Sequence, residues 1–154
     1  MAINKKLEKL LEQNKIKYET IEHRKVYTAF DSAETQHVKL AEVAKAVLLK
    51  SKNDLYLAVL PAGNNTDFKK LSKIIGDKIS MAKEKDITSK LKTKVGLVTP
   101  FGNLFGIKVY LDNKLKKAKK IILPAGSYTE SVRISTKDYI KLETPTTGSF
   151  SVKK

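Results

Sequence analysis

The sequence has 154 residues, enough for one domain whose hydrophobic core needs no covalent cross-links. It contains no cysteine, which excludes disulfides and thiolate nucleophiles, and its two histidines are too few for a conventional structural zinc site. Neither a signal-type core nor a run of roughly 20 apolar residues occurs. We therefore expect a cytoplasmic protein without a membrane span, metal or cofactor.

The formal net charge of +15 is unevenly distributed along the chain. Residues 1–77 carry 14 basic and 10 acidic side chains, a net charge of +4, whereas residues 78–154 carry 17 and 6, a net charge of +11. Such a surface attracts polyanions, because neutralising phosphates releases counterions. The alternative is general solubility, since only Arg24 and Arg133 among the 31 basic residues are arginine. The charge favours a nucleic-acid partner.

Apolar spacing and capping residues predict several helices. Ile3, Leu7 and Leu10 follow helical spacing. Thr28 is a suitable N-cap for a second helix, and residues 64–67 supply a turn and an N-cap for a third, which Gly76 closes. Thr136 can cap the last helix. The predicted helices cover residues 3–14, 28–34, 68–75, 83–91 and 136–142.

The stretch Val43–Lys50 reads Val-Ala-Lys-Ala-Val-Leu-Leu-Lys, with four consecutive aliphatic residues between two lysines. This pattern predicts a strand covered on both faces. A short helical turn over residues 40–44 would deliver Lys45 to the strand entrance, where a lysine usually keeps its ammonium in water. The apolar run 55–60, ended by Pro61, is expected to pair with this strand as a hairpin.

Further strands are predicted at residues 16–22, 78–81, 95–99, 107–111, 121–123 and 132–134. Together these elements predict a single compact α/β (mixed α+β) domain over residues 1–143, with a mixed, largely antiparallel sheet flanked by helices. Residues 144–154 are rich in Thr, Ser and Gly and are expected to form a flexible C-terminal tail. No Walker-type, GxGxxG or GxSxG motif occurs, which argues against the common phosphate-loop and hydrolase classes.

Three segments, in this order, resemble one family: Val-Ala-Lys-Ala-Val-Leu-Leu-Lys at 43–50, Gly-Leu-Val-Thr-Pro-Phe-Gly at 96–102 and Val-Tyr-Leu-Asp at 109–112. With weaker matches at 27–29, 59–62 and 125–126, the sequence resembles the YbaK/ProX prolyl-tRNA editing domains over nearly its whole length. The resemblance implies a freestanding deacylase that hydrolyses the ester of a mischarged tRNA, without a cofactor. Its implied partners are tRNA, of the tRNA(Pro) type in this family, and a prolyl-tRNA synthetase.

The resemblance also implies roles for individual residues. Lys45 and Gly96 match catalytic positions: an ammonium can hold the phosphate or ribose of the terminal adenosine, and backbone amides near a glycine can stabilise an oxyanion. A substrate hydroxyl or a bound water would be the nucleophile. The implied substrate-binding residues are Thr28, Pro100, Phe101, Gly102, Asp112 and Gly126.

The density of lysines in the second half of the chain adds a predicted tRNA-facing surface. It consists of the run Lys114, Lys116, Lys117, Lys119 and Lys120, together with Lys90, Lys92 and Lys94.

Some alternatives stay open at this point. Asp112 can equally be a structural acid at a strand end, and core packing is the more common role of a residue such as Phe101. Ala125 stands where family members often carry serine, and no histidine follows His37, so the edited amino acid is not assigned. The same two departures favour a noncatalytic tRNA-binding or synthetase-associated module as the alternative function.

Overall fold

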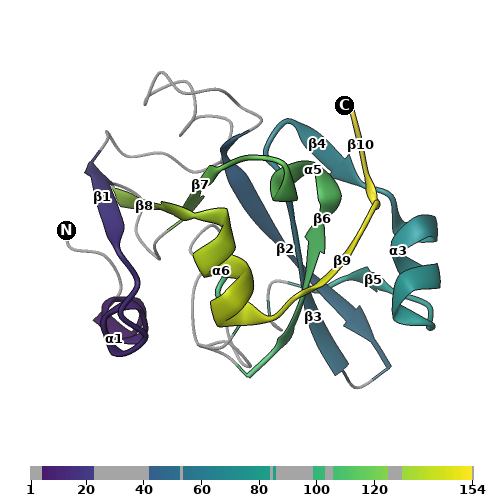
Figure 1. The fold of residues 1–154 in the computed structure, drawn as a ribbon. Helices are drawn as coiled ribbons and strands as arrows, with labels where there is room; N and C mark the ends of the chain where they lie inside the picture. The colour runs from purple at the N-terminus through teal and green to yellow at the C-terminus, as the bar shows by residue number, and fades with distance from the viewer. Residues whose placement is uncertain are drawn as a thin grey trace.

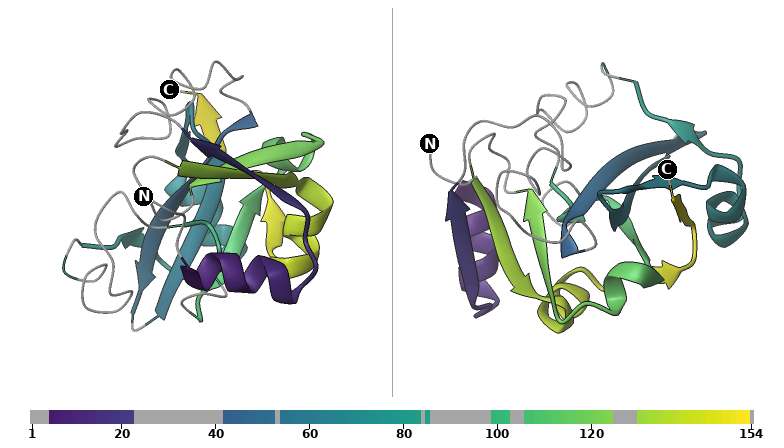
Figure 2. Two further views of the ribbon diagram at one scale, coloured as in Figure 1. Left: turned by 90° about the vertical axis from the view of Figure 1, so that its left-hand side faces the viewer. Right: turned by 90° about the horizontal axis from the view of Figure 1, so that it is seen from above.

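The computed structural model describes residues 5–22, 42–52, 54–83, 85, 99–102, 106–124 and 130–153 (Figure 1, Figure 2). The helices are α1 (Lys5–Gln13), α3 (Phe68–Ile75), α5 (Asn113–Lys116) and α6 (Thr136–Glu143). The strands are β1 (Tyr18–Glu22), β2 (Ala44–Ser51), β3 (Asp54–Pro61), β4 (Asn64–Thr66), β5 (Ser80–Met81), β6 (Lys108–Asp112), β7 (Lys120–Pro124), β8 (Glu130–Ser135), β9 (Thr146–Gly148) and β10 (Ser151–Lys153).

A five-stranded sheet with the order β5-β2-β3-β6-β9 occupies the centre of the molecule. β2 pairs antiparallel with β3 and β5, whereas β6 runs parallel to β3, and β9 parallel to β6. The antiparallel sheet β1-β8-β7 is joined to it by a bridge between Val43 and Ile122, and β10 pairs with β4. The predicted mixed α+β domain with largely antiparallel pairing is confirmed, but the strands in the described residues are divided among three sheets.

The hairpin of β2 and β3 forms as predicted. Its register runs from Ala44 opposite Pro61 to Ser51 opposite Asp54. Val43 already forms the bridge to β7, and Ala44 begins β2, so the helical turn predicted to extend through residue 44 is wrong at its end. Lys45 is therefore the second residue of β2, where pairing with β3 holds its backbone, and it does not directly follow a helix.

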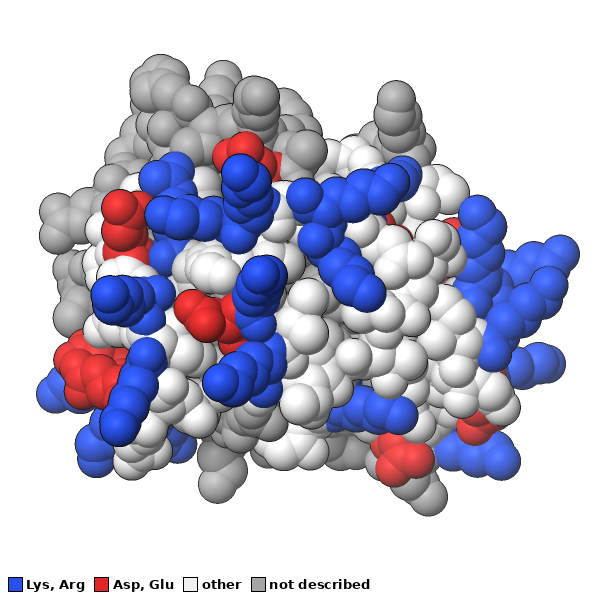
Figure 3. All heavy atoms as spheres, in the orientation of Figure 1, with Lys and Arg blue, Asp and Glu red and all other residues white. Residues whose placement is uncertain are grey.

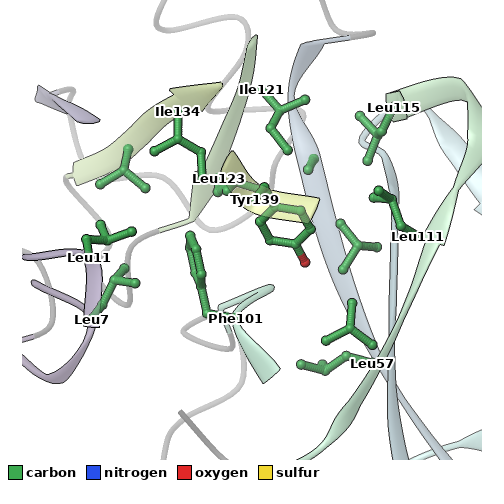
Figure 4. Close-up of a cluster of buried hydrophobic side chains, with 14 of the residues drawn as sticks. Leu7, Leu11, Leu57, Phe101, Leu111, Leu115, Ile121, Leu123, Ile134 and Tyr139 are labelled. Carbon is green, nitrogen blue, oxygen red and sulfur yellow. The ribbon is translucent and has the colours of Figure 1, made fainter. Parts of the chain in front are cut away.

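Side chains alternate along each strand, so each face of the central sheet contributes to a different core. The main core lies against both larger sheets and is closed by α1 and α6 (Figure 4). It contains Leu7, Leu11, Ala44, Leu48, Leu57, Val59, Phe101, Val109, Leu111, Leu115, Ile121, Leu123, Val132, Ile134 and Tyr139. The second core contains Leu49, Ala58, Leu60, Leu71, Tyr110 and Phe150, with α3 on its outer side.

Helix ends follow the capping rules, with one correction. The Asp67 side chain accepts a hydrogen bond from the Lys70 amide at 3.1 Å, and Gly76 ends α3 in the left-handed region at φ 86°, as predicted. The preceding residues 64–66 form β4 rather than a turn. The N-cap of α6 is Ser135, not Thr136: the Ser135 backbone is extended, but its side chain makes no capping hydrogen bond. The Thr136 hydroxyl instead donates to the Ala118 carbonyl at 2.6 Å.

The C-terminal segment, for which the sequence predicted a flexible tail, contains two short strands at residues 146–148 and 151–153. β9 extends the central sheet alongside β6, and β10 pairs with β4. Phe150 lies between these two strands and is fully buried in the second core. The Thr/Ser/Gly composition does not reveal this arrangement, in which one buried aromatic and two short strand pairings hold a polar segment in place.

The helices predicted at residues 28–34 and 83–91 and the strand predicted at 95–99 lie wholly or mostly outside the described residues. In the part of the chain that the structure covers, no helix has both the length and the apolar character required to cross a membrane.

Candidate functional site

Lys45 lies on the central hairpin, where it is half-buried and pairs in register with Leu60 of β3. The strand entrance is held by a hydrogen bond from the Ala62 amide to the Val43 carbonyl at 2.8 Å. Because Ala44 and Leu48 face the main core, alternation places Lys45 on the other face of β2, together with Val47 and Leu49. The backbone of Lys45 is therefore held by strand pairing on its β3 side.

The segment Thr99–Gly102, which ends the glycine- and proline-containing motif, is buried. Phe101 is fully buried in the main core, and its ring meets that of Tyr139 edge to face, with centroids 5.6 Å apart at 72° (Figure 4). Phe101 therefore packs on the face of β2 opposite to Lys45, and the structure does not bring these two side chains into one pocket. The core-packing alternative for Phe101 fits the geometry, because burying an aromatic ring removes a large apolar area from water.

Gly102 is required by close packing of the chain on β6. A Cβ atom at this position would lie 2.3 Å from the Ile107 carbonyl oxygen and 2.5 Å from Cγ2 of Val109. The Ile107 amide donates to the Gly102 carbonyl at 3.0 Å, so the two residues lie against each other. This contact explains the glycine without a ligand.

Asp112 organises two segments of backbone at the end of β6. Its side chain is 1% exposed. One carboxylate oxygen accepts hydrogen bonds from the amides of Phe150 at 2.9 Å and Ser151 at 3.1 Å. The other accepts from the Ser151 hydroxyl at 2.8 Å and from the amide of Lys114, at the start of α5, at 3.1 Å. The geometry favours the structural alternative for Asp112.

Tyr139 is a residue whose importance was missed by sequence reasoning, which gave it only an apolar position on the last helix. Its hydroxyl donates a hydrogen bond to the carbonyl of Pro100, and the whole side chain is buried. Burial, and secondarily the charge of Glu143, raise the pKa of the Tyr139 phenol well above its usual value, so it stays a protonated donor. The available signal was the hydroxyl itself, since a buried tyrosine requires a polar partner.

The basic run after Asp112 is displayed on the surface. All five lysines of this run are exposed, on α5, on the connection to β7 and at the start of β7: Lys114, Lys116, Lys117, Lys119 and Lys120. The remaining predicted residues, namely Thr28, Lys90, Lys92, Lys94, Gly96 and Gly126, lie outside the described residues. Within the described ranges, no group of three or more histidine, aspartate or glutamate side chains is placed to hold a metal ion.

Residues 23–142 match the family described as "Aminoacyl-tRNA editing domain". The chain belongs to this family. The match includes the hairpin with Lys45, the segment ending at Gly102 and the basic run, and it confirms the resemblance to the YbaK-type editing domains.

Relatives of this editing domain include a protein without an assigned activity and part of a synthetase. The chain is 28% identical over 112 residues to "Uncharacterized protein YwhH" of Bacillus subtilis, covering 72% of this chain and 71% of that one. It is 27% identical over 99 residues to "Proline--tRNA ligase" of Fervidobacterium nodosum, covering 64% of this chain but only 17% of that protein.

The fold is shared with solved structures of very different sequence. One, described as "a putative trans-editing enzyme for prolyl tRNA synthetase", superposes with a TM-score of 0.84 at 18% identity and covers 96% of each chain. This coverage is larger than that of the family match, so the shared fold extends beyond residues 23–142.

Proposed function

We propose that this editing domain hydrolyses the ester bond of mischarged aminoacyl-tRNA. The observation that carries the proposal is the family match over residues 23–142, within which Lys45 stands on a strand paired on its β3 side. Placing a cation rigidly beside a reacting ester is the requirement of catalysis by positioning. The net charge of +15 supports a polyanionic substrate.

The proposed chemistry is an acyl transfer to water. The Lys45 ammonium holds the terminal adenosine through its phosphate or ribose oxygens, and a water attacks the ester carbonyl carbon and gives up a proton. Backbone amides near Gly96 stabilise the oxyanion that forms. The new C–O bond forms as the ester C–O bond to the ribose breaks, and the ribose oxygen takes up a proton. The products are the free amino acid and tRNA with an intact 3′ end.

A tRNA(Pro)-type substrate acted on in trans is the first candidate. Two comparisons support it: the relative named "Proline--tRNA ligase" and the solved structure described as a trans-editing enzyme. Ala125 stands where family members often carry serine, so we leave the edited amino acid to experiment.

The test is single-turnover deacylation of a panel of mischarged tRNAs by the purified protein, with correctly charged prolyl-tRNA as the control. We expect the protein to accelerate hydrolysis of at least one mischarged tRNA far more than that of the control. If it binds tRNA but accelerates no hydrolysis in the panel, the noncatalytic RNA-binding module is the correct function.

A further inference from the structure

The last helix is fixed against the predicted tRNA-facing run. The Thr136 amide donates to the Lys119 carbonyl at 3.0 Å, and the Thr136 hydroxyl donates to the Ala118 carbonyl at 2.6 Å. Beneath the surface, Leu115 of α5 and Tyr139 of α6 are both fully buried in the main core. The first turn of α6 and the run 114–120 therefore form one piece of surface, although Lys119 and Thr136 are 17 residues apart in sequence.

The exposed side chains of this surface are mostly lysines. Lys137 and Lys141 are exposed on α6, and their spacing of four residues places them on one side of the helix. They extend the five exposed lysines of the run, and Figure 3 shows basic side chains gathered over this part of the face. Among the described residues, no acidic side chain forms an ion pair with any of these seven lysines.

Acidic side chains on this part of the described chain are fewer than its seven exposed lysines. Asp112 is buried and hydrogen-bonded, and Glu143 is buried at the far end of α6. Only Asp138, which is half-buried, lies between the two α6 lysines. A surface that served solubility alone would mix both signs.

We propose that Lys137 and Lys141 bind phosphates of the tRNA substrate, together with the run 114–120, as one continuous surface formed by α5, the start of β7 and α6. This rests on the proposed function, which makes tRNA the substrate. Lysine is a compact point charge without the planar fork of arginine, so the surface recognises the phosphate backbone rather than base edges.

The chain offers a matched control on α3. Lys69 and Lys73 have the same spacing of four residues, are exposed on a helix of the same eight-residue length, and form no ion pair with a described acidic side chain. α3 lies at the right-hand end of Figure 1, away from α6. The double variants Lys137→Gln/Lys141→Gln and Lys69→Gln/Lys73→Gln thus remove the same charge from different places.

The experiment measures Kd for uncharged tRNA at several salt concentrations. Each phosphate neutralised by the protein contributes roughly 0.7 to 0.9 to the slope of log affinity against log salt. We expect the α6 pair to lower this slope by about 1.4 to 1.8 and the α3 pair to leave it unchanged. Equal effects of both pairs, no effect of the α6 pair, or no tRNA binding by the parent protein would each overturn the proposal.

Binding of uncharged tRNA does not depend on ester hydrolysis, so the two proposals fail separately. A reduced slope for the α6 pair in a protein that hydrolyses nothing in the mischarged panel would retain this surface and reject the deacylase. If the parent protein hydrolyses a mischarged tRNA but the α6 pair leaves the salt slope unchanged, the deacylase is retained and this surface is rejected.

Discussion

Lys45 and Lys50 lie on the same strand, so a comparison of their variants tests the catalytic role proposed for Lys45. Both are half-buried on β2, but alternation places them on opposite faces, because Lys50 follows Leu48 on the side of the main core. They share residue type, strand and degree of burial. Lys50→Ala is therefore the matched control for Lys45→Ala.

We expect Lys45→Ala to lower the single-turnover deacylation rate by about 100-fold or more, since removal of one fixed electrostatic group in an acyl-transfer site has this effect. Its melting temperature should fall by less than about 4 °C, because a partly exposed ammonium contributes about 1 kcal/mol or less. Lys50→Ala should keep most of the activity. Equal rates for Lys45→Ala and the parent, or equal losses in both variants, would remove Lys45 from the catalytic machinery.

The hydrogen bond between Tyr139 and Pro100 provides a second prediction. Tyr139→Phe keeps the ring that packs on Phe101 but leaves the buried Pro100 carbonyl without its donor. The free energy of unfolding, measured with urea, should fall by about 1 to 3 kcal/mol. If the segment Thr99–Gly102 shapes the substrate pocket, kcat should also fall at a temperature where the variant is fully folded.

The control for Tyr139→Phe is Ile134→Val. Ile134 is buried in the same core, and its apolar side chain cannot hydrogen-bond to Pro100. Removal of one methyl group there should lower the free energy of unfolding by about 0.5 to 1.5 kcal/mol. A greater loss of kcat in Tyr139→Phe than in Ile134→Val would show positioning of the segment. Matching losses would leave Tyr139 with a role in stability alone.

Among the elements, the C-terminal strands show how composition and structure diverge. β9 and β10 are only three residues each, yet Phe150 between them lies in the second core, and the amides of Phe150 and Ser151 donate hydrogen bonds to Asp112. The same carboxylate caps α5. The C-terminal segment therefore supports the start of the basic run from beneath.

Phe150 and Val152 allow this element to be tested within one segment. Phe150 is 0% exposed and Val152 is 38% exposed. Phe150→Ala should cost about 3 to 5 kcal/mol of unfolding free energy, as buried aromatic truncations do, whereas Val152→Ala should cost less than about 1 kcal/mol. Urea denaturation of both variants measures the difference. A cost near zero for Phe150→Ala would restore the flexible tail that composition predicted.

For the whole molecule, the net charge of +15 predicts how salt acts on turnover. Electrostatic attraction concerns the encounter with tRNA, not the bond-breaking step, so kcat/KM should fall with ionic strength while kcat stays nearly constant. With three or more phosphates neutralised, kcat/KM should drop by more than about tenfold between about 50 and 200 mM salt.

An aminoacyl ester of adenosine alone is the control substrate for that measurement, because it lacks the tRNA body. Its hydrolysis should be insensitive to salt over the same range. Equal salt dependence for this small ester and for full-length tRNA would mean that salt acts on the protein itself rather than on tRNA binding.

Local sequence signals were enough to predict several of the helices and strands of this protein. The four aliphatic residues after Lys45, the capping pair Asp67 and Gly76, and the strand ending at Asp112 are each decided by neighbours in sequence, and the structure confirms them. Buried apolar runs and caps can be predicted because hydrophobic burial and hydrogen bonding of helix ends act over a few residues. Net charge and the order of motifs, in the same way, pointed to the editing-domain family and to tRNA.

Contacts between distant segments were decided only by the tertiary structure. Tyr139 meets Pro100, Asp112 binds the Ser151 amide, and Thr136 meets Lys119, with sequence separations of 39, 39 and 17 residues. Whether Phe101 lines a pocket or fills a core depends on which face of β2 it meets, and a single sequence does not encode that face locally. The physical reason is that side-chain partners across sheets follow from strand order and packing of the whole domain, which no short stretch of residues specifies.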